Sequence, residues 1–276
     1  MRKLIVILIA FIFYSCEETV VLDLKQTPSK VVIEGLVTDK PGYQSVKVTR
    51  TADFYSSGKT PRITNASVVV SDDLGNEIAF VHNPNNHPDS TGIYLPETAF
   101  TGVVGRTYAL RVEVDGVEYL AQDKLLPVTN IDSLKVQKNP DQVEDPKDEG
   151  KIYEVLLFAR EPQNQKDFYL FKFYRNDTLT YFIDTDVYYS DDELLGEKID
   201  GVPSPVYYGL NDVATVEMYS MSRQGYVYYN DLNLLLNNDG GMFGSIPASP
   251  RTNLSNGALG FFQVSAIATS SVVILE

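Results

Sequence analysis

Short runs of alternating apolar and polar residues, separated by turn-forming residues, fill the chain from residue 30 onward. In residues 45–49, SVKVT, every second side chain is apolar, which is the pattern of a strand buried on one face. Asp115-Gly116 separates two such runs and indicates a tight hairpin, because both residue types tolerate the positive φ that such a turn needs. This periodicity predicts a mainly β protein.

The first part of the pattern predicts a β-sandwich over residues 30–127. About seven short strands with turn signals between them fit an immunoglobulin-like sandwich. The stretches ITNASVVVSDDLGNE (63–77), GIYLP (92–96) and GVVGRTYALRVEVDG (102–116) also resemble prealbumin-like or carboxypeptidase-regulatory-like β-sandwich modules. That resemblance implies structural roles for Gly92 and Tyr94 and no catalytic role.

The second part, residues 128–276, predicts another β-rich domain that contains one α-helix. Pro127 ends the first part, and residues 139–150 combine two prolines with mixed charge, which is typical of an exposed loop. A helix is expected near 222–237, where Ser222 can cap the first turn. Its apolar residues recur near the helical period at Tyr226, Tyr229, Leu232 and Leu236.

The amino-terminal segment predicts a removed signal peptide and a lipid anchor. Arg2 and Lys3 precede ten apolar residues, a run shorter than the ~20 residues that span a bilayer as a helix. Cys16, the only cysteine, follows the small residue Ser15, and this arrangement resembles a bacterial lipobox. We expect a signal peptide over 1–15, an acylated Cys16 and a tether over 16–29. The alternatives are a plain signal peptide with an incidental cysteine, or a short buried strand.

The composition argues against several classes of function. Without Arg2 and Lys3, 21 basic residues face 37 acidic ones, a formal charge of −16. Binding to nucleic acid or to an anionic membrane surface relies on basic patches, so neither is expected. No cysteine follows Cys16, so no internal disulfide and no thiolate metal site is expected.

No motif in the chain predicts catalysis or a bound cofactor. The two histidines, His82 and His87, share one Pro/Asn-rich loop with Asp89, where solvated side chains are favoured over a metal site. Nucleophile-elbow, phosphate-loop and zinc-protease motifs are all missing from the sequence. The acidic stretch 184–193 departs from the EF-hand pattern at its required Gly and Glu, which leaves an irregular calcium site as an open alternative to a solvated turn.

Tyrosine is the most suggestive feature of the composition. The chain has 18 Tyr, 13 Phe and no Trp, and Tyr favours interfaces because it joins a large ring to a polar tip. Neighbouring residues of a strand point to opposite faces, so one ring of each pair, Tyr188-Tyr189 and Tyr207-Tyr208, is a candidate contact with a partner or ligand. The alternative is that Tyr simply suits strands. We expect the second part to carry the partner-facing surface and the first part to act mainly as a spacer.

Several stretches resemble one family across nearly the whole chain. They are the Cys16 signal, VVIEGLVTDKPGYQSVKVTRTADF (31–54), GVVGRTYAL (102–110), LPVTNIDSL (126–134) and NLSNGALGFFQVSAI (253–267). They resemble Bacteroidota outer-membrane lipoproteins of the domain-of-unknown-function family 4249, which are companions of TonB-dependent receptors. The resemblance implies a non-enzymatic lipoprotein on the cell surface that assists a receptor barrel in nutrient capture or uptake. The alternative is a structural or adhesive surface module with no transport role.

The lipobox yields a direct prediction for Cys16. Cys16→Ala removes the only thiol, so we expect the variant to lose acylation and to stay soluble or unprocessed. Metabolic labelling with a fatty-acid analogue measures this. Label retained by the alanine variant would rule out an anchor at Cys16.

Overall fold

The computed structural model describes residues 28–52, 60–160, 166–191, 198–238 and 248–275. Within these ranges the chain is mainly β with one α-helix, which confirms the predicted fold class. No described helix has the length and apolar character needed to cross a membrane. The predicted signal peptide, Cys16 and most of the tether lie outside the described residues.

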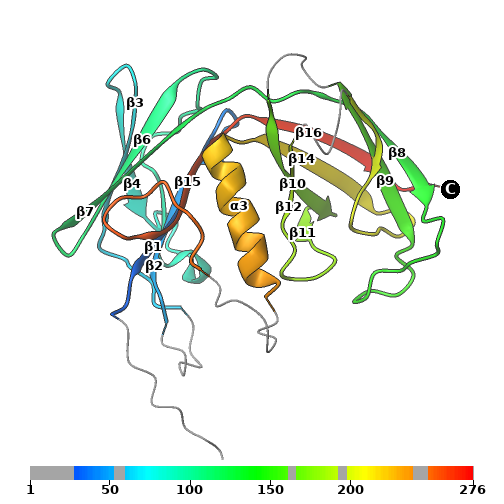
Figure 1. Cartoon of the computed structure of the whole chain (residues 1–276), viewed down its shortest axis with the longest axis horizontal. Helices are drawn as coiled ribbons and strands as arrows, with labels where there is room; N and C mark the ends of the chain where they lie inside the picture. The colour runs from blue at the N-terminus through cyan, green and yellow to red at the C-terminus, as the bar shows by residue number, and fades with distance from the viewer. Residues whose placement is uncertain (1–27, 53–59, 161–165, 192–197, 239–247, 276) are drawn as a thin grey trace, which may run out of the picture.

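Eight strands form the first sheet (Figure 1). They are β1 (Val31–Thr38), β2 (Ser45–Arg50), β3 (Ser67–Asp72), β4 (Glu77–His82), β5 (Ile93–Pro96), β6 (Thr107–Val114), β7 (Val117–Lys124) and β15 (Leu259–Ser265). Their order is β15-β1-β2-β5-β4-β3-β6-β7, and a short 3₁₀ helix, η2 (Pro88–Ser90), interrupts the connection from β4 to β5. We call this sheet and its core the first unit.

The first sheet curls until its two end strands meet. A parallel bridge joins Leu126, just after β7, to Ser265 of β15, and Val264 N donates to Asp123 Oδ2 at 3.1 Å. Burial raises the pKa of Asp123 to about 6, although this backbone hydrogen bond opposes the shift. Side chains such as Leu110 fill the enclosed core. The sandwich is therefore one continuous wrapped sheet rather than two separate layers.

One strand of the first unit comes from the far end of the chain. β15 pairs in parallel with β1, from Val32 opposite Leu259 to Thr38 opposite Ser265. The strand pairing therefore does not follow the expected division into 30–127 and 128–276, because residues 259–265 form a strand of the first sheet. Periodicity identifies a strand but not a partner this distant in sequence.

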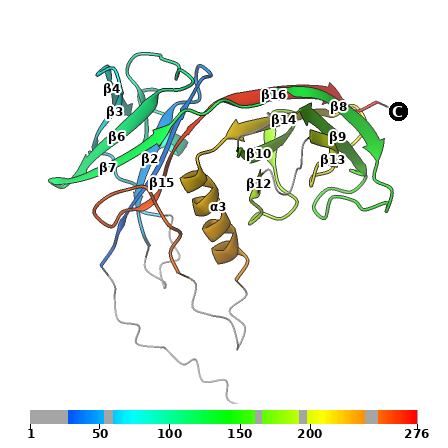
Figure 2. The same cartoon turned by 45° about the horizontal axis from the view of Figure 1, so that its top comes forward.

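Two sheets packed face to face form the second unit. Its strands are β8 (Ile131–Lys138), β9 (Tyr153–Arg160), β10 (Phe168–Arg175), β11 (Thr178–Thr180), β12 (Tyr188–Asp191), β13 (Lys198–Pro203), β14 (Val213–Ser220) and β16 (Ile267–Val273). One sheet has the order β11-β10-β14-β16 with β12 also paired to β10, and the other has the order β13-β9-β8. Figure 2 shows β16 running from β15 toward the carboxyl terminus, so one segment serves both units.

The start of the second unit, up to β9, is more ordered than the sequence predicts. Residues 131–138 form strand β8, and the following loop is not uniformly exposed. Asn139 and Asp145 are buried, and Asn139 Nδ2 donates to Glu154 Oε2 at 2.8 Å. The prediction of an exposed loop over 139–150 is wrong at these positions, because their polar side chains have partners distant in sequence.

Helix α3 (Arg223–Leu236) confirms the predicted helix and stands between the two units (Figure 1). Ser222 is its N-cap, and the Oγ atom accepts from Gly225 N at 3.2 Å. On one side Tyr226 packs on Phe168 of β10, with ring centroids 4.8 Å apart. On the other side Tyr228 stacks on Phe261 of β15 at 5.0 Å. The helix therefore contacts both units.

The closeness of β1 and β15 makes Gly260 hard to replace. A Cβ added there would lie 2.0 Å from Ile33 O, at a φ of +97°. We expect Gly260→Ala to lower the free energy of unfolding by about 3–5 kcal/mol, because left-handed strain and overpacking combine. Gly257→Ala is the matched control, since Gly257 has a φ of +72° but nothing within 4 Å. Urea unfolding compares them, and equal losses would contradict the close approach at Gly260.

Candidate functional site

A groove runs between helix α3 and the outer face of β1 and β2. It consists of two adjoining hollows of about 430 and 300 Å³, which share Glu34, Lys47, Tyr228 and Leu232 in their walls. We call it the α3 groove. One wall belongs to the first unit and the other to the second part of the chain. Both parts of the chain line this groove, and the expectation that the first part acts mainly as a spacer stays a prediction.

Aromatic rings form the helical side of the α3 groove. Tyr228 stacks on Phe261 with an interplanar angle of 22° and meets Tyr229 edge-on at 5.2 Å. The Tyr229 hydroxyl donates to Gln263 Oε1 at 2.6 Å. Burial raises the pKa of Tyr228 to about 12, so this phenol stays neutral at physiological pH. The contacts to β15 hold both tyrosines in fixed orientations.

Charged side chains line the strand side and one end of the groove. Lys47 of β2 and Glu34 of β1 form a cross-strand ion pair at 2.6 Å. The Lys172 Nζ atom lies 4.6 Å from the ring centroid of Tyr219, over its face. Burial lowers the pKa of Lys172, and the nearby Glu217 carboxylate opposes the shift. The groove thus combines apolar faces with a few fixed charges.

A buried carboxylate beside the groove joins the two units. Glu217 of β14 is only 4% exposed and accepts hydrogen bonds from three phenols. The distances are 2.5 Å from Tyr43, 2.9 Å from Tyr174 and 2.6 Å from Tyr219. Tyr43 lies between β1 and β2, so its bond crosses from the first unit to the second. The hydrogen bond to Glu217, with burial, raises the pKa of Tyr43 to about 12.

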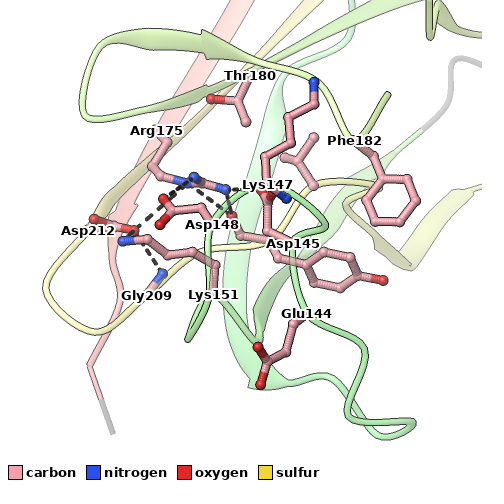
Figure 3. Close-up of polar contacts among 12 residues, drawn as sticks. Glu144, Asp145, Lys147, Asp148, Lys151, Arg175, Thr180, Phe182, Gly209 and Asp212 are labelled. Atoms are coloured by element: carbon pink, nitrogen blue, oxygen red, sulfur yellow. Dashed lines mark hydrogen bonds and ion pairs between the residues drawn. The ribbon is translucent and has the colours of Figure 1, made fainter. Parts of the chain in front are cut away.

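A second polar cluster holds the 139–150 loop in place (Figure 3). Arg175 of β10 pairs with Asp145 at 2.5 Å and with Asp148 at 3.1 Å, and its Nε lies 3.9 Å from Asp212. Asp212 in turn pairs with Lys151 at 3.0 Å. These charges satisfy one another, so the cluster has a structural role in fixing the loop against β10.

The predicted tyrosine pair Tyr207-Tyr208 divides between surface and core. Tyr208 is fully buried, and its hydroxyl has no hydrogen-bond partner within the described part of the chain. Tyr207 is half-buried, and its ring meets Phe182 edge-on at 5.8 Å. Only Tyr207 is open to a partner, and a contact there stays a prediction.

The pair Tyr188-Tyr189 makes internal contacts on both faces of β12. Tyr188 packs edge-on against Phe173 at 5.4 Å, and its hydroxyl donates to Asp186 Oδ2 at 2.9 Å. The Tyr189 hydroxyl donates to Asn230 Oδ1 of α3 at 3.1 Å. Tyr188 packs against the core that contains Tyr208, whereas Tyr189 contacts α3, so the four tyrosines do not form one exposed surface.

The candidate metal ligands contact other groups. His82 Nε2 accepts from Gly92 N at 2.9 Å, and His87 Nδ1 accepts from Asp89 N at 3.3 Å. In the acidic stretch, Asp184 pairs with Lys147, while Asp186 accepts from Ile183 N and from the Tyr188 hydroxyl. Among the described residues, no three His, Cys, Asp or Glu side chains gather in a way that could hold a metal ion.

Comparison with protein families identifies the chain. Residues 17–271 match the family model described as "Domain of unknown function (DUF4249)". The chain belongs to the DUF4249 family. No curated protein matches it in sequence. The matched range includes every residue of the α3 groove, so the groove is part of the family domain.

Sequence reasoning on this DUF4249 chain missed most of its groove. Lys47, Lys172 and Gln263 lie in three strands that are far apart in sequence, and only the fold brings them together. The local signal that could have found it is the run of tyrosines at 226, 228 and 229 in the predicted helix. Those tyrosines indicated an aromatic helix face but not the strands opposite it.

The two buried phenols Tyr208 and Tyr219 should respond differently to loss of their hydroxyls. Tyr219→Phe removes a donor to buried Glu217, and we expect it to lower the free energy of unfolding by about 1–3 kcal/mol. Tyr208→Phe removes a buried hydroxyl that has no described partner, so we expect unchanged or higher stability. Urea unfolding of both variants tests this. A loss above about 1 kcal/mol in Tyr208→Phe would mean that its hydroxyl is hydrogen-bonded.

Proposed function

We propose that this protein is a lipid-anchored, non-enzymatic protein of the outer-membrane surface that captures a ligand in the α3 groove for a TonB-dependent receptor. The observation that carries the proposal is the groove itself, whose walls come from both units. The receptor would then take up the captured nutrient through its barrel. The protein's own contribution is binding.

The groove has the character of a small-molecule site. Such sites are concave and mostly apolar, with a few polar groups that orient the ligand. Tyr228 and Leu232 supply apolar surface, while Glu34, Lys47 and Lys172 supply the polar groups. Glu217 fixes the units on either side, which keeps the groove formed before a ligand arrives.

Two features of the sequence support the location and the partner. Cys16 follows a short apolar run, so acylation there would anchor the folded units through the tether 16–29. The stretches that resemble Bacteroidota outer-membrane lipoproteins support a TonB-dependent receptor as the partner. The proposal includes no catalytic step, because the buried Glu217 beside the groove is already occupied by three phenols.

The test of this function is a pull-down of the full-length, tagged lipoprotein from detergent-solubilised outer membranes after mild cross-linking. We expect one receptor barrel to co-purify with the wild-type protein. Cys16→Ala is the control, because without its anchor the protein should not reach the receptor. A correctly anchored wild-type protein that captures no barrel would overturn the receptor partnership.

Growth of a deletion strain separates the proposal from the alternative of a structural or adhesive module. The proposal predicts slower growth when one nutrient is limiting, with normal surface attachment. Normal growth on every nutrient with lost attachment would favour the adhesive module instead.

A further inference from the structure

The charge of the α3 groove is opposite to that of the whole protein. The chain has a formal net charge of −14. The two hollows of the groove are nevertheless lined by Lys47, Arg50, Arg62 and Lys172, against a single carboxylate, Glu34. A local excess of cations in an acidic protein favours an anionic ligand at that place.

Two of these cations lack an ion pair within the described residues. Lys47 pairs with Glu34 at 2.6 Å, and Arg50 pairs with Asp115 at 2.5 Å. Arg62 and Lys172 form no such pair in the described part of the chain. For half-buried Lys172 the arrangement is costly, because burial penalises the ammonium, and the aromatic face of Tyr219 and the nearby Glu217 carboxylate compensate only partly. An anion bound in the groove would relieve this cost.

The two hollows of the groove add different side chains to the four residues that they share. One hollow adds Lys172, Tyr219, Tyr229 and Gln263. The other adds the apolar side chains of Val32, Leu235, Pro250 and Leu259, together with Arg50, Arg62 and three threonines. Along β1 the groove reaches from Leu36 to Val32, which is about 13 Å at ~3.3 Å per residue. A ligand that fills both hollows is therefore elongated, with an apolar body beside Leu232 and Leu235 and an anionic group within reach of the cations.

The strands behind the groove argue against a peptide that adds to the sheet. β1 is paired on both sides, with β15 and with β2, along most of its length. Its backbone N–H and C=O groups are therefore engaged, and an extended peptide would find no free edge to pair with. The groove offers side chains rather than backbone groups.

We propose that the α3 groove binds an amphipathic organic anion, with its carboxylate or phosphate head at Lys172 and its apolar chain along Leu232 and Leu235. The inference deepens the proposed function by naming the ligand class of the same groove. A free fatty-acid-like carboxylate and an anionic membrane lipid share this chemistry, and the experiment below separates them.

The experiment uses the full chain with Cys16→Ala, so that neither detergent nor its own anchor competes for the groove. Isothermal titration is performed with decanoate, decanol and acetate. We expect decanoate to bind at least about tenfold more tightly than decanol, because a charge-assisted contact is lost in the alcohol. Acetate should bind still more weakly, because it lacks the apolar chain. Equal affinities for decanoate and decanol would overturn the anion site.

Variants of Lys172 locate the head group. Lys172→Met should weaken decanoate binding about tenfold, whereas Lys172→Arg, which keeps the charge, should retain most of it. Lys138→Met is the matched control, since exposed Lys138 lies on β8 in the other sheet of the second unit, and should leave binding unchanged. Thermal unfolding verifies that each variant is folded. Decanoate binding that Lys172→Met does not alter would overturn the proposed position of the head.

Two further experiments test the position of the apolar chain and the source of the ligand. Leu235→Ser should weaken decanoate binding and leave acetate binding unaffected. The opposite pattern would overturn the proposed position of the apolar chain.

Vesicles of anionic phospholipid test the membrane as the source of the ligand. If the protein binds these vesicles through Lys172 but does not bind decanoate, the head group is a lipid phosphate. An acidic peptide that binds where both other probes fail would overturn the amphipathic class. The receptor pull-down needs no added ligand, so failure here leaves that partnership open to its own test.

Discussion

Between Val32 and Thr38, β1 pairs in parallel with β15 along almost its whole length, and β16 begins after a single residue, Ala266. This one segment closes the first sheet and then enters the second unit. The direction of this segment sets the orientation of the two units. Only one residue separates β15 from β16, so the units have little freedom to rotate relative to each other. Helix α3 fills the angle between them, and the α3 groove is the space that remains.

Glu217 provides the second connection between the units, and its chemistry explains why it is stable. A buried carboxylate without partners would be costly, but three O–H donors satisfy its oxygens. One of those donors, Tyr43, belongs to the first unit. The same carboxylate lies near Lys172, so the residue that fixes the orientation of the units also contributes to the electrostatics of the groove.

Local features of the sequence predicted local features of the structure. Asp115 and Gly116 both have the positive φ that their hairpin demands, and Ser222 caps the one described α-helix. The sequence did not predict contacts between residues that are far apart in the chain. Glu217 looks like an ordinary outward-facing strand residue in VATVEMYS, and Asp145 looks like part of a solvated loop, because their partners Tyr43 and Arg175 are distant in sequence. Likewise, nothing local distinguishes buried Tyr208 from its half-buried neighbour Tyr207.

The position of β15 has a consequence for how the chain acquires its structure. During synthesis from the amino end, the segments that form β1 to β7 are complete long before residues 259–265 are added. Until then one edge of β1 is unpaired, and an open edge recruits other chains. Pairings between distant segments also form slowly, because a long loop must close before the contact is gained. We therefore expect the pairing of β15 with β1 to be a slow step of folding, and a chain that lacks residues 259–265 to be prone to aggregation through the open edge of β1.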